Sequence, residues 1–167
     1  MASEADTAVH LRDTRLRRVA AGDGSLYEGA CQTPDFGLSL QARSTQPVLL
    51  QGQAGYSRKG PQAGQASHYY SQPQLAVQAR VQPTGGPAVQ AEGRAWLDHE
   101  WSESVLDPQA AGWDWVGMNL DDGRALMAFQ IRDRQGGTVW AGGSWREPGQ
   151  PARALAPGEL RWTPTRH

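Results

Sequence analysis

The residues best suited to chemistry lie close together between positions 96 and 115, where a histidine, three aspartates and several tryptophans occur. Successive side chains of a β-strand point to opposite faces, so an extended segment over 96–101 places His99 and Trp101 on one face. The same alternation places Asp114 with the apolar residues of the next strand. Because apolar faces are expected to turn inward, the pattern predicts that these three side chains share an apolar interior.

A carboxyl group in an apolar interior is costly to ionise, so the pKa of Asp114 is expected to rise. A carboxyl group with a raised pKa can donate a proton near neutral pH. Trp101, with Trp113 nearby, would stabilise the developing cation through its ring face, and His99 would position a water molecule. The expected chemistry is protonation of an apolar alkene followed by attack of water, and it needs no cofactor.

Other interpretations of the same residues are open. Asp114 and His99 also suit a satisfied structural hydrogen-bonded pair. Asp98 and Glu100 alternate out of phase with His99, so they are expected to face outward as a solvated or interface pair. His68 and His99 lack the spacing of metal ligands, so no metal site is expected. A serine–histidine–aspartate triad can be drawn, but no Gly-x-Ser-x-Gly elbow supports it.

Aromatic and apolar side chains near these residues are expected to line a ligand cavity. Two adjacent tyrosines in a segment rich in hydroxyl groups suit the mouth of such a cavity, and they also suit ordinary strand positions. The predicted ligand-binding residues are Trp113, Trp115, Tyr69, Tyr70, Met118, Met127 and Phe129.

Short alternating segments separated by turn residues must position these side chains. Asp121-Asp122-Gly123 between two strand-like segments is the strongest hairpin signal, whereas residues 11–21 suit either a short helix or a charged edge strand. Residues 51–67 are polar and glycine-rich and predict a loop. The expected fold is an all-β antiparallel sandwich or barrel. Its strands are expected over 35–40, 74–81, 88–97, 113–120, 124–132 and 138–145.

Length and composition exclude several classes of function. The chain has 167 residues, with 16 Lys and Arg against 17 Asp and Glu, so its net charge is −1. That balance argues against a nucleic-acid partner and against a polybasic membrane patch. A single cysteine excludes an internal disulfide. No transmembrane segment is predicted, and Met1–His10 lacks the pattern of a signal peptide.

Four motifs carry a resemblance to a known family. Residues 66–71 (ASHYYS), 93–101 (GRAWLDHEW), 112–115 (GWDW) and 120–127 (LDDGRALM) resemble the AttH/CrtC-like family of bacterial lipocalin-like proteins, predicted hydrolases related to carotenoid 1,2-hydratase. The resemblance implies two lipocalin-like antiparallel barrels with a site near their junction. In the hydratase branch it implies protonation of an isoprenoid alkene by an aspartate near a histidine and a tryptophan. Asp114, His99 and Trp101 are the matching positions.

The resemblance also implies an organisation for the whole chain. Members of the family are longer, so this chain is expected to be a short or truncated member. Its expected parts are a disordered N-terminus over 1–10, a lipocalin-like β domain over 11–146, and a C-terminal segment over 147–167 that begins a second barrel. Open barrel edges are expected to allow self-association. The family suggests a secreted, periplasmic or cell-envelope location.

The sequence therefore supports one leading function and two alternatives. The leading hypothesis is a lipocalin-like protein that binds an apolar isoprenoid or lipid ligand and catalyses hydration of a terminal carbon–carbon double bond. One alternative is a carrier of hydrophobic ligands without catalysis. The other is a carbohydrate-binding or glycoside-cleaving β-protein, in which tryptophans stack on sugars and paired carboxylates do the chemistry.

Overall fold

The computed structural model describes residues 6–103, 106–155 and 158–163, and within them the chain forms twelve β-strands and no helix. The prediction of an all-β antiparallel fold is confirmed. No helix in the described part of the chain is long and apolar enough to cross a membrane. The strands are β1 (Ala8–Leu11), β2 (Thr14–Ala21), β3 (Gly24–Gln32), β4 (Phe36–Arg43), β5 (Leu49–Leu50), β6 (Tyr56–Arg58), β7 (Ala66–Pro83), β8 (Val89–Trp101), β9 (Gly112–Asn119), β10 (Ala125–Arg132), β11 (Thr138–Arg146) and β12 (Arg153–Ala154).

Two compact units make up the chain. Unit 1 consists of Met1–Pro47 and Gln74–Ala95, and unit 2 consists of Val48–Pro73 and Trp96–His167. The long strands β7 and β8 pass from one unit into the other along the chain. Each unit is described below by itself.

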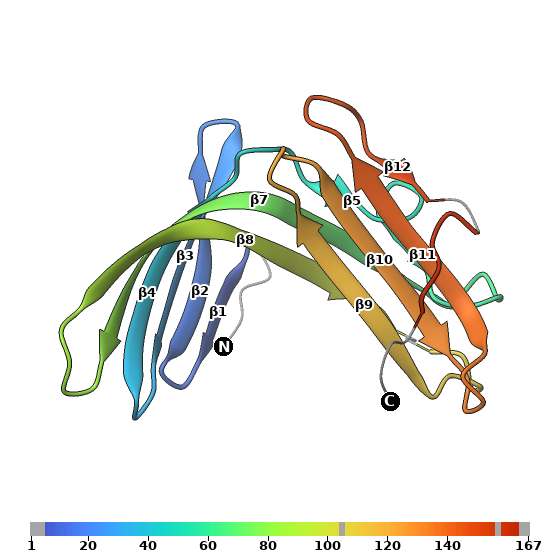
Figure 1. Ribbon diagram of the computed structural model, residues 1–167, viewed down its shortest axis with the longest axis horizontal. Helices are drawn as coiled ribbons and strands as arrows, with labels where there is room; N and C mark the ends of the chain where they lie inside the picture. Colours follow the sequence, from blue (N-terminus) through green and yellow to red (C-terminus); the bar gives the residue numbers. More distant parts are fainter. Residues whose placement is uncertain (1–5, 104–105, 156–157, 164–167) are drawn as a thin grey trace. The chain divides into compact units, whose positions relative to one another are not determined.

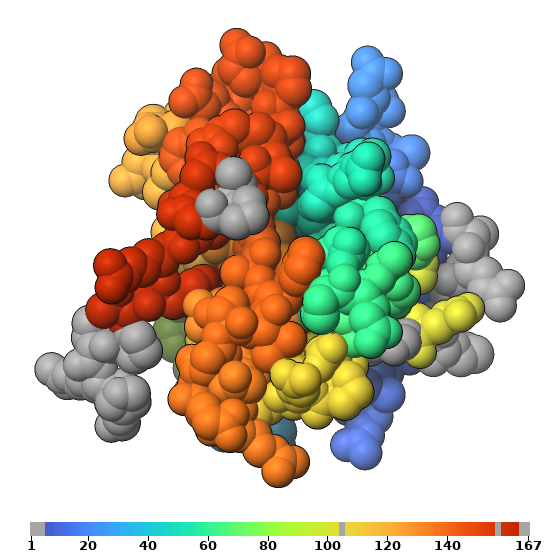
Figure 2. Space-filling model, turned by 90° about the vertical axis from the view of Figure 1, so that its right-hand side faces the viewer, coloured from blue at the N-terminus to red at the C-terminus, as the bar shows by residue number. Residues whose placement is uncertain are grey.

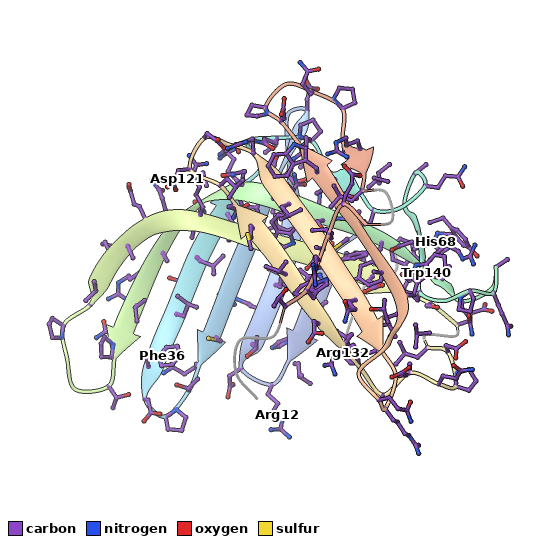
Figure 3. The ribbon with its side chains drawn as sticks, turned by 45° about the vertical axis from the view of Figure 1, so that its right-hand side comes forward. Arg12, Phe36, His68, Asp121, Arg132 and Trp140 are labelled. Atoms are coloured by element: carbon purple, nitrogen blue, oxygen red, sulfur yellow. The ribbon has the colours of Figure 1, made fainter. Side chains whose placement is uncertain are left out.

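Unit 1 is an antiparallel sheet in which β1, β2, β3, β4 and the second part of β7 follow one another as neighbours. Residues 11–21, for which the sequence left a helix open, lie mostly in β2, whose backbone pairs with strands on both sides. Arg12 and Phe36 lie at the same end of these strands (Figure 3). The expected disorder of residues 1–10 does not extend to Ala8–His10, which belong to β1; residues 1–5 lie outside the described residues.

Unit 2 has two layers. One is the four-stranded antiparallel sheet β12-β11-β10-β9. Its strands β9, β10 and β11 run side by side in Figure 1. The other contains β5, β6 and the first part of β7, with the end of β8 beside it. Residues 48–65 contain the short strands β5 and β6 and lie beside β10 and β11 (Figure 2). The loop expected over 51–67 therefore includes β6 and the first two residues of β7.

The core of unit 2 forms where these two layers meet. Tyr69 of β7 packs against Met127, Phe129 and Ile131 of β10, and each of these four side chains is at most 5% exposed. The predicted hairpin is confirmed, because β9 and β10 pair from Asn119↔Ala125 onward and Gly123 in the turn has a φ of 86°. A positive φ favours glycine at that position. The hairpin thereby fixes which residues of β9 lie opposite the core residues of β10.

Candidate functional site

Buried hydroxyl groups and carboxylates meet on one face of β7 and β8 in unit 2. Ser67, Tyr69 and Ser71 alternate along β7 and are nearly inaccessible to solvent. The Ser67 hydroxyl donates to Glu100 Oε1 and the Ser71 hydroxyl donates to Asp98 Oδ1, each over 2.5 Å. We call the face of unit 2 that carries Tyr69 the inner face. Asp98 and Glu100 lie on this face, so the predicted facing is wrong, but both residues are solvent-exposed, as expected for a solvated pair.

Several donors hold the Asp98 carboxylate in one orientation. Trp96 donates its indole N–H to Asp98 Oδ1 over 2.8 Å, in addition to the bond from Ser71. The Tyr69 hydroxyl also hydrogen-bonds to Asp98. Asp98 itself is exposed, whereas Ser71 and Tyr69 beneath it are buried. The Asp98 carboxylate is therefore open to solvent while buried or half-buried polar side chains fix its orientation.

Tyr69 connects this carboxylate to the second sheet. Its hydroxyl oxygen accepts the indole N–H of Trp115 on β9 over 3.1 Å. Burial raises the pKa of Tyr69 above its ordinary value, and the negative charge of Asp98 raises it further. The Tyr69 hydroxyl therefore keeps its proton at neutral pH and remains a donor to Asp98.

Lys59 is the only lysine in the sequence, and it is 7% exposed. Its ammonium lies 2.8 Å from Glu100 Oε1 and donates to Ser57 over 3.3 Å. It also lies 4.7 Å from the ring centre of Tyr69 and 4.2 Å from that of Phe129. Burial lowers the pKa of Lys59, while Glu100 and Asp98 oppose that shift. The inner face thus contains a buried cation between two rings and two carboxylates.

The lowered pKa of Lys59 predicts how stability depends on pH. Between that lowered value and the ordinary value of 10.5, the folded protein binds fewer protons than the unfolded chain. The free energy of unfolding is therefore expected to rise with pH through this window and to fall as pH drops through the lowered pKa. Lys59→Met keeps a long apolar side chain and removes the charge, so its stability should lack this rise.

The measurement is urea unfolding of both proteins at several pH values below 10.0, the ordinary pKa of tyrosine, since Tyr69 contributes with the opposite sign at higher pH. Subtracting the two profiles removes the contributions of the other groups. Equal slopes for the wild type and Lys59→Met would contradict a buried Lys59.

His99 and Trp101 lie on the opposite face of β8 from Asp98 and Glu100. The Tyr70 hydroxyl lies 3.0 Å from His99 Nδ1, and the ring centres of His99 and Trp101 are 5.1 Å apart. His68 stacks on Trp101 at 5.3 Å, and Trp101 is 52% exposed. The prediction that His99 and Trp101 face an apolar interior is therefore wrong, because they form an exposed aromatic cluster.

Asp114 also lies away from the inner face. It stands opposite Gln130 in the register of β9 and β10, whereas Trp115 stands opposite the core residue Phe129. The Asp114 carboxylate binds Arg132, at 2.6 Å to Nε and 3.2 Å to Nη2, and is 38% exposed. Arg132 is labelled in Figure 3. The prediction of a desolvated Asp114 beside His99 is wrong, since its carboxylate is paired and half-exposed.

Gly117 explains why the facing of β9 was predicted wrongly. The sequence interpretation took the apolar residues that alternate with Asp114 as the inward face of β9, but tryptophans occupy that face. A Cβ atom at Gly117 would lie 2.6 Å from the Trp115 ring and 2.9 Å from the Trp96 ring. Gly117 therefore leaves the space in which these two indoles meet on the inner face.

The predicted ligand-binding residues divide into two groups. Tyr69, Met127 and Phe129 belong to the packed core, whereas Trp113, Trp115 and Met118 are 63%, 43% and 41% exposed and Tyr70 is half-buried. Their role in ligand binding stays a prediction.

Sequence reasoning missed the residues that the inner face brings together. Asp98 and Glu100 were expected to be solvated, as they are, but on the other face of β8. Ser67 and Ser71 were noted only as part of a segment rich in hydroxyl groups, and Lys59 was not singled out. The alternation of Ser67, Tyr69 and Ser71 was the available signal. Lys59 follows a strand of three residues in a glycine-rich segment, where no periodicity marks it. Within the described residues, no three His, Cys, Asp or Glu side chains gather as a metal site.

Comparisons with known proteins agree with the fold described above. A family model described as AttH-like matches residues 1–167. A crystal structure of a candidate AttH from Nitrosomonas europaea is similar over 95% of this chain and 48% of its own, with 43% identity and a TM-score of 0.88. Kievitone hydratase from Nectria haematococca is similar over 90% of this chain and 46% of its own, with 12% identity and a TM-score of 0.70. No curated protein matches. The chain spans about half the length of these solved structures.

Proposed function

Because this chain belongs to the AttH-like family of lipocalin-like proteins, we propose that its unit 2 binds an apolar alkene and adds water across the double bond without a cofactor. The observation that carries the proposal is the exposed Asp98 carboxylate, held by Ser71, Trp96 and Tyr69 from below. The name of the distant structural neighbour, kievitone hydratase, supports this class of reaction. The fold similarity to that protein supports a common scaffold.

Asp98 and Glu100 are the two groups that would transfer protons. They are two positions apart on one strand, so their Cα atoms are roughly 7 Å apart and both side chains reach the same space. Ser71 and Trp96 bind Oδ1 of Asp98, and Ser67 and Lys59 bind Oε1 of Glu100. The second oxygen of each carboxyl group is the one that we assign to the substrate or to water.

The assigned roles follow from the position of Lys59. Its ammonium contacts Glu100 directly, so Glu100 is the carboxylate that acts as base, and Asp98 is the acid. Asp98 gives its proton to one alkene carbon, and the other carbon becomes a cation beside the indole rings of Trp96 and Trp115. Water attacks that carbon and passes its proton to Glu100. Solvent then takes the proton from Glu100 and supplies a new proton to Asp98, so one water molecule is consumed for each alkene.

The experiment offers the full chain a set of prenyl alcohols with terminal double bonds, in water enriched in ¹⁸O. Mass spectrometry should detect a product that has gained one water molecule and contains one ¹⁸O atom. Fluorescence of the exposed tryptophans should report binding of the same compounds. Binding of these compounds without product would favour the carrier, and the absence of both binding and product would overturn the proposal.

A further inference from the structure

One row of side chains crosses the sheet of unit 1 from β1 to β7. The backbone pairings are His10↔Arg15, Arg15↔Ala30, Ala30↔Ser39 and Ser39↔Arg80, and paired residues of neighbouring strands share a face. We call Arg15, Ala30, Ser39 and Arg80 the arginine row. Neighbouring strands are about 4.8 Å apart, so the Cα atoms of the two arginines are roughly 14 Å apart. Both side chains are long enough to extend over the small residues between them.

Two grooves in unit 1 include the whole arginine row. The larger has a volume of about 930 Å³ and also contains Arg17, Glu28 and Gln41, which lie two positions along their strands to one side of the row. The smaller has a volume of about 470 Å³ and contains Asp13, Gln32 and Gln82 on the other side. Because Ala30 and Ser39 are small, the two grooves adjoin above the centre of the row.

The arginines of this face differ in how far their charge is neutralised. Arg17 forms an ion pair with Glu28, with 2.5 Å between Nη2 and Oε2. Arg80 donates only to the neutral amide of Gln82 over 2.8 Å, and Arg15 makes no ion pair with any residue that the structure describes. Arg15 and Arg80, at the two ends of the arginine row, therefore each carry a positive charge with no carboxylate partner among the described residues, in a chain whose net charge is −1.

We propose that the arginine row binds the carboxylate or phosphate group of an organic anion, whose remaining atoms occupy the larger groove. A planar guanidinium matches either group with two parallel hydrogen bonds, and the Ser39 hydroxyl between the arginines is a further donor. The volume of the larger groove is within the range of about 300–1,000 Å³ that small-molecule sites occupy. The site belongs to unit 1 and is separate in chemistry from the hydration proposed for unit 2.

The test is isothermal titration calorimetry of the full chain with three probes of equal chain length: dodecanoate and dodecyl phosphate, each below its micelle concentration, and dodecanol below its solubility limit. The two anions are expected to bind and neutral dodecanol is not, and the tighter anion identifies which group the row prefers. Arg15→Gln and Arg80→Gln should each weaken binding of that anion about tenfold, because each removes one charged hydrogen-bonding partner.

Arg17→Gln is the matched control, since it removes the same charge from the same groove at a position that Glu28 already neutralises. Its affinity for the anion should stay close to that of the wild type. All three positions are solvent-exposed, and circular dichroism checks that each variant keeps its strand content. Equal losses in all three variants would show a general charge effect and overturn the proposal. Binding of dodecanol as tight as that of the anions, or no binding of either anion, would overturn it as well.

Discussion

Asp98→Asn is expected to lower the rate of water addition by about 10² to 10⁴, the range that removal of a general acid usually costs. The amide oxygen of asparagine can still accept the hydrogen bonds from Ser71 and Trp96, so the side chain should keep its place. The variant loses only the ability to donate a carboxyl proton to the alkene. The measurement is the initial rate of ¹⁸O incorporation, with substrate binding followed separately by tryptophan fluorescence.

Asp114→Asn is the matched control for this experiment. It makes the same chemical change at the aspartate that the sequence favoured as the acid, and it removes one partner of a half-exposed ion pair with Arg132. Because exposed ion pairs contribute little to stability, this variant should fold and keep the wild-type rate. If Asp114→Asn abolished turnover and Asp98→Asn did not, the assignment made here would be wrong and the sequence-based one would be restored.

Phe129→Ala is expected to lower the free energy of unfolding by about 3–5 kcal/mol, the usual cost of removing a buried phenylalanine ring. Phe129 is 5% exposed and packs against Tyr69, and its ring lies under the ammonium of Lys59. A Cβ atom at Gly142, the paired residue on β11, would lie 3.0 Å from this ring. The ring therefore fills the space above a glycine, and its loss leaves a cavity that the backbone of β11 can hardly close.

Phe36→Ala provides the comparison for urea unfolding monitored by circular dichroism. Phe36 begins β4 in unit 1 and is 37% exposed, so its truncation should change the free energy of unfolding by less than about 1 kcal/mol. If Phe129→Ala unfolded at the same urea concentration as the wild type and lost affinity for the prenyl alcohols, Phe129 would line a ligand site, as the sequence suggested, instead of supporting the core.

The fold class could be read from the sequence because strand signals are local. Alternating segments and turn residues predicted the antiparallel strands, and the Asp-Gly pair at 122–123 located the β9–β10 hairpin. The motifs that resemble the AttH/CrtC-like family pointed to the family whose model matches the whole chain. These features depend on neighbouring residues in the sequence and need no knowledge of distant contacts.

The candidate site could not be read in the same way. Alternation assigns residues to two faces of a strand, but it does not say which face is covered. For β9 that choice depends on Gly117, which admits the rings of Trp96 and Trp115, and on the register with β10. For β8 the choice of face depends on contacts with β7, where the buried Ser67 and Ser71 donate hydrogen bonds to Glu100 and Asp98. The choice of face was wrong on both strands, and all three predicted catalytic residues were misplaced for this reason.

The continuity of β7 has a consequence for how this chain can change during evolution. Its first residues carry Ser67, Tyr69 and Ser71, and beyond Gln74, whose φ is 55°, the same strand carries Arg80 of the arginine row. Deleting or inserting one residue between Gln74 and Arg80 would shift the register of β7 against β4 and turn Arg80 to the other face of the unit 1 sheet. Insertions and deletions within this part of β7 are therefore expected to be rare in related chains. Length variation in related chains should instead collect at Thr84–Gly86, the turn after β7, where an extra residue changes no facing.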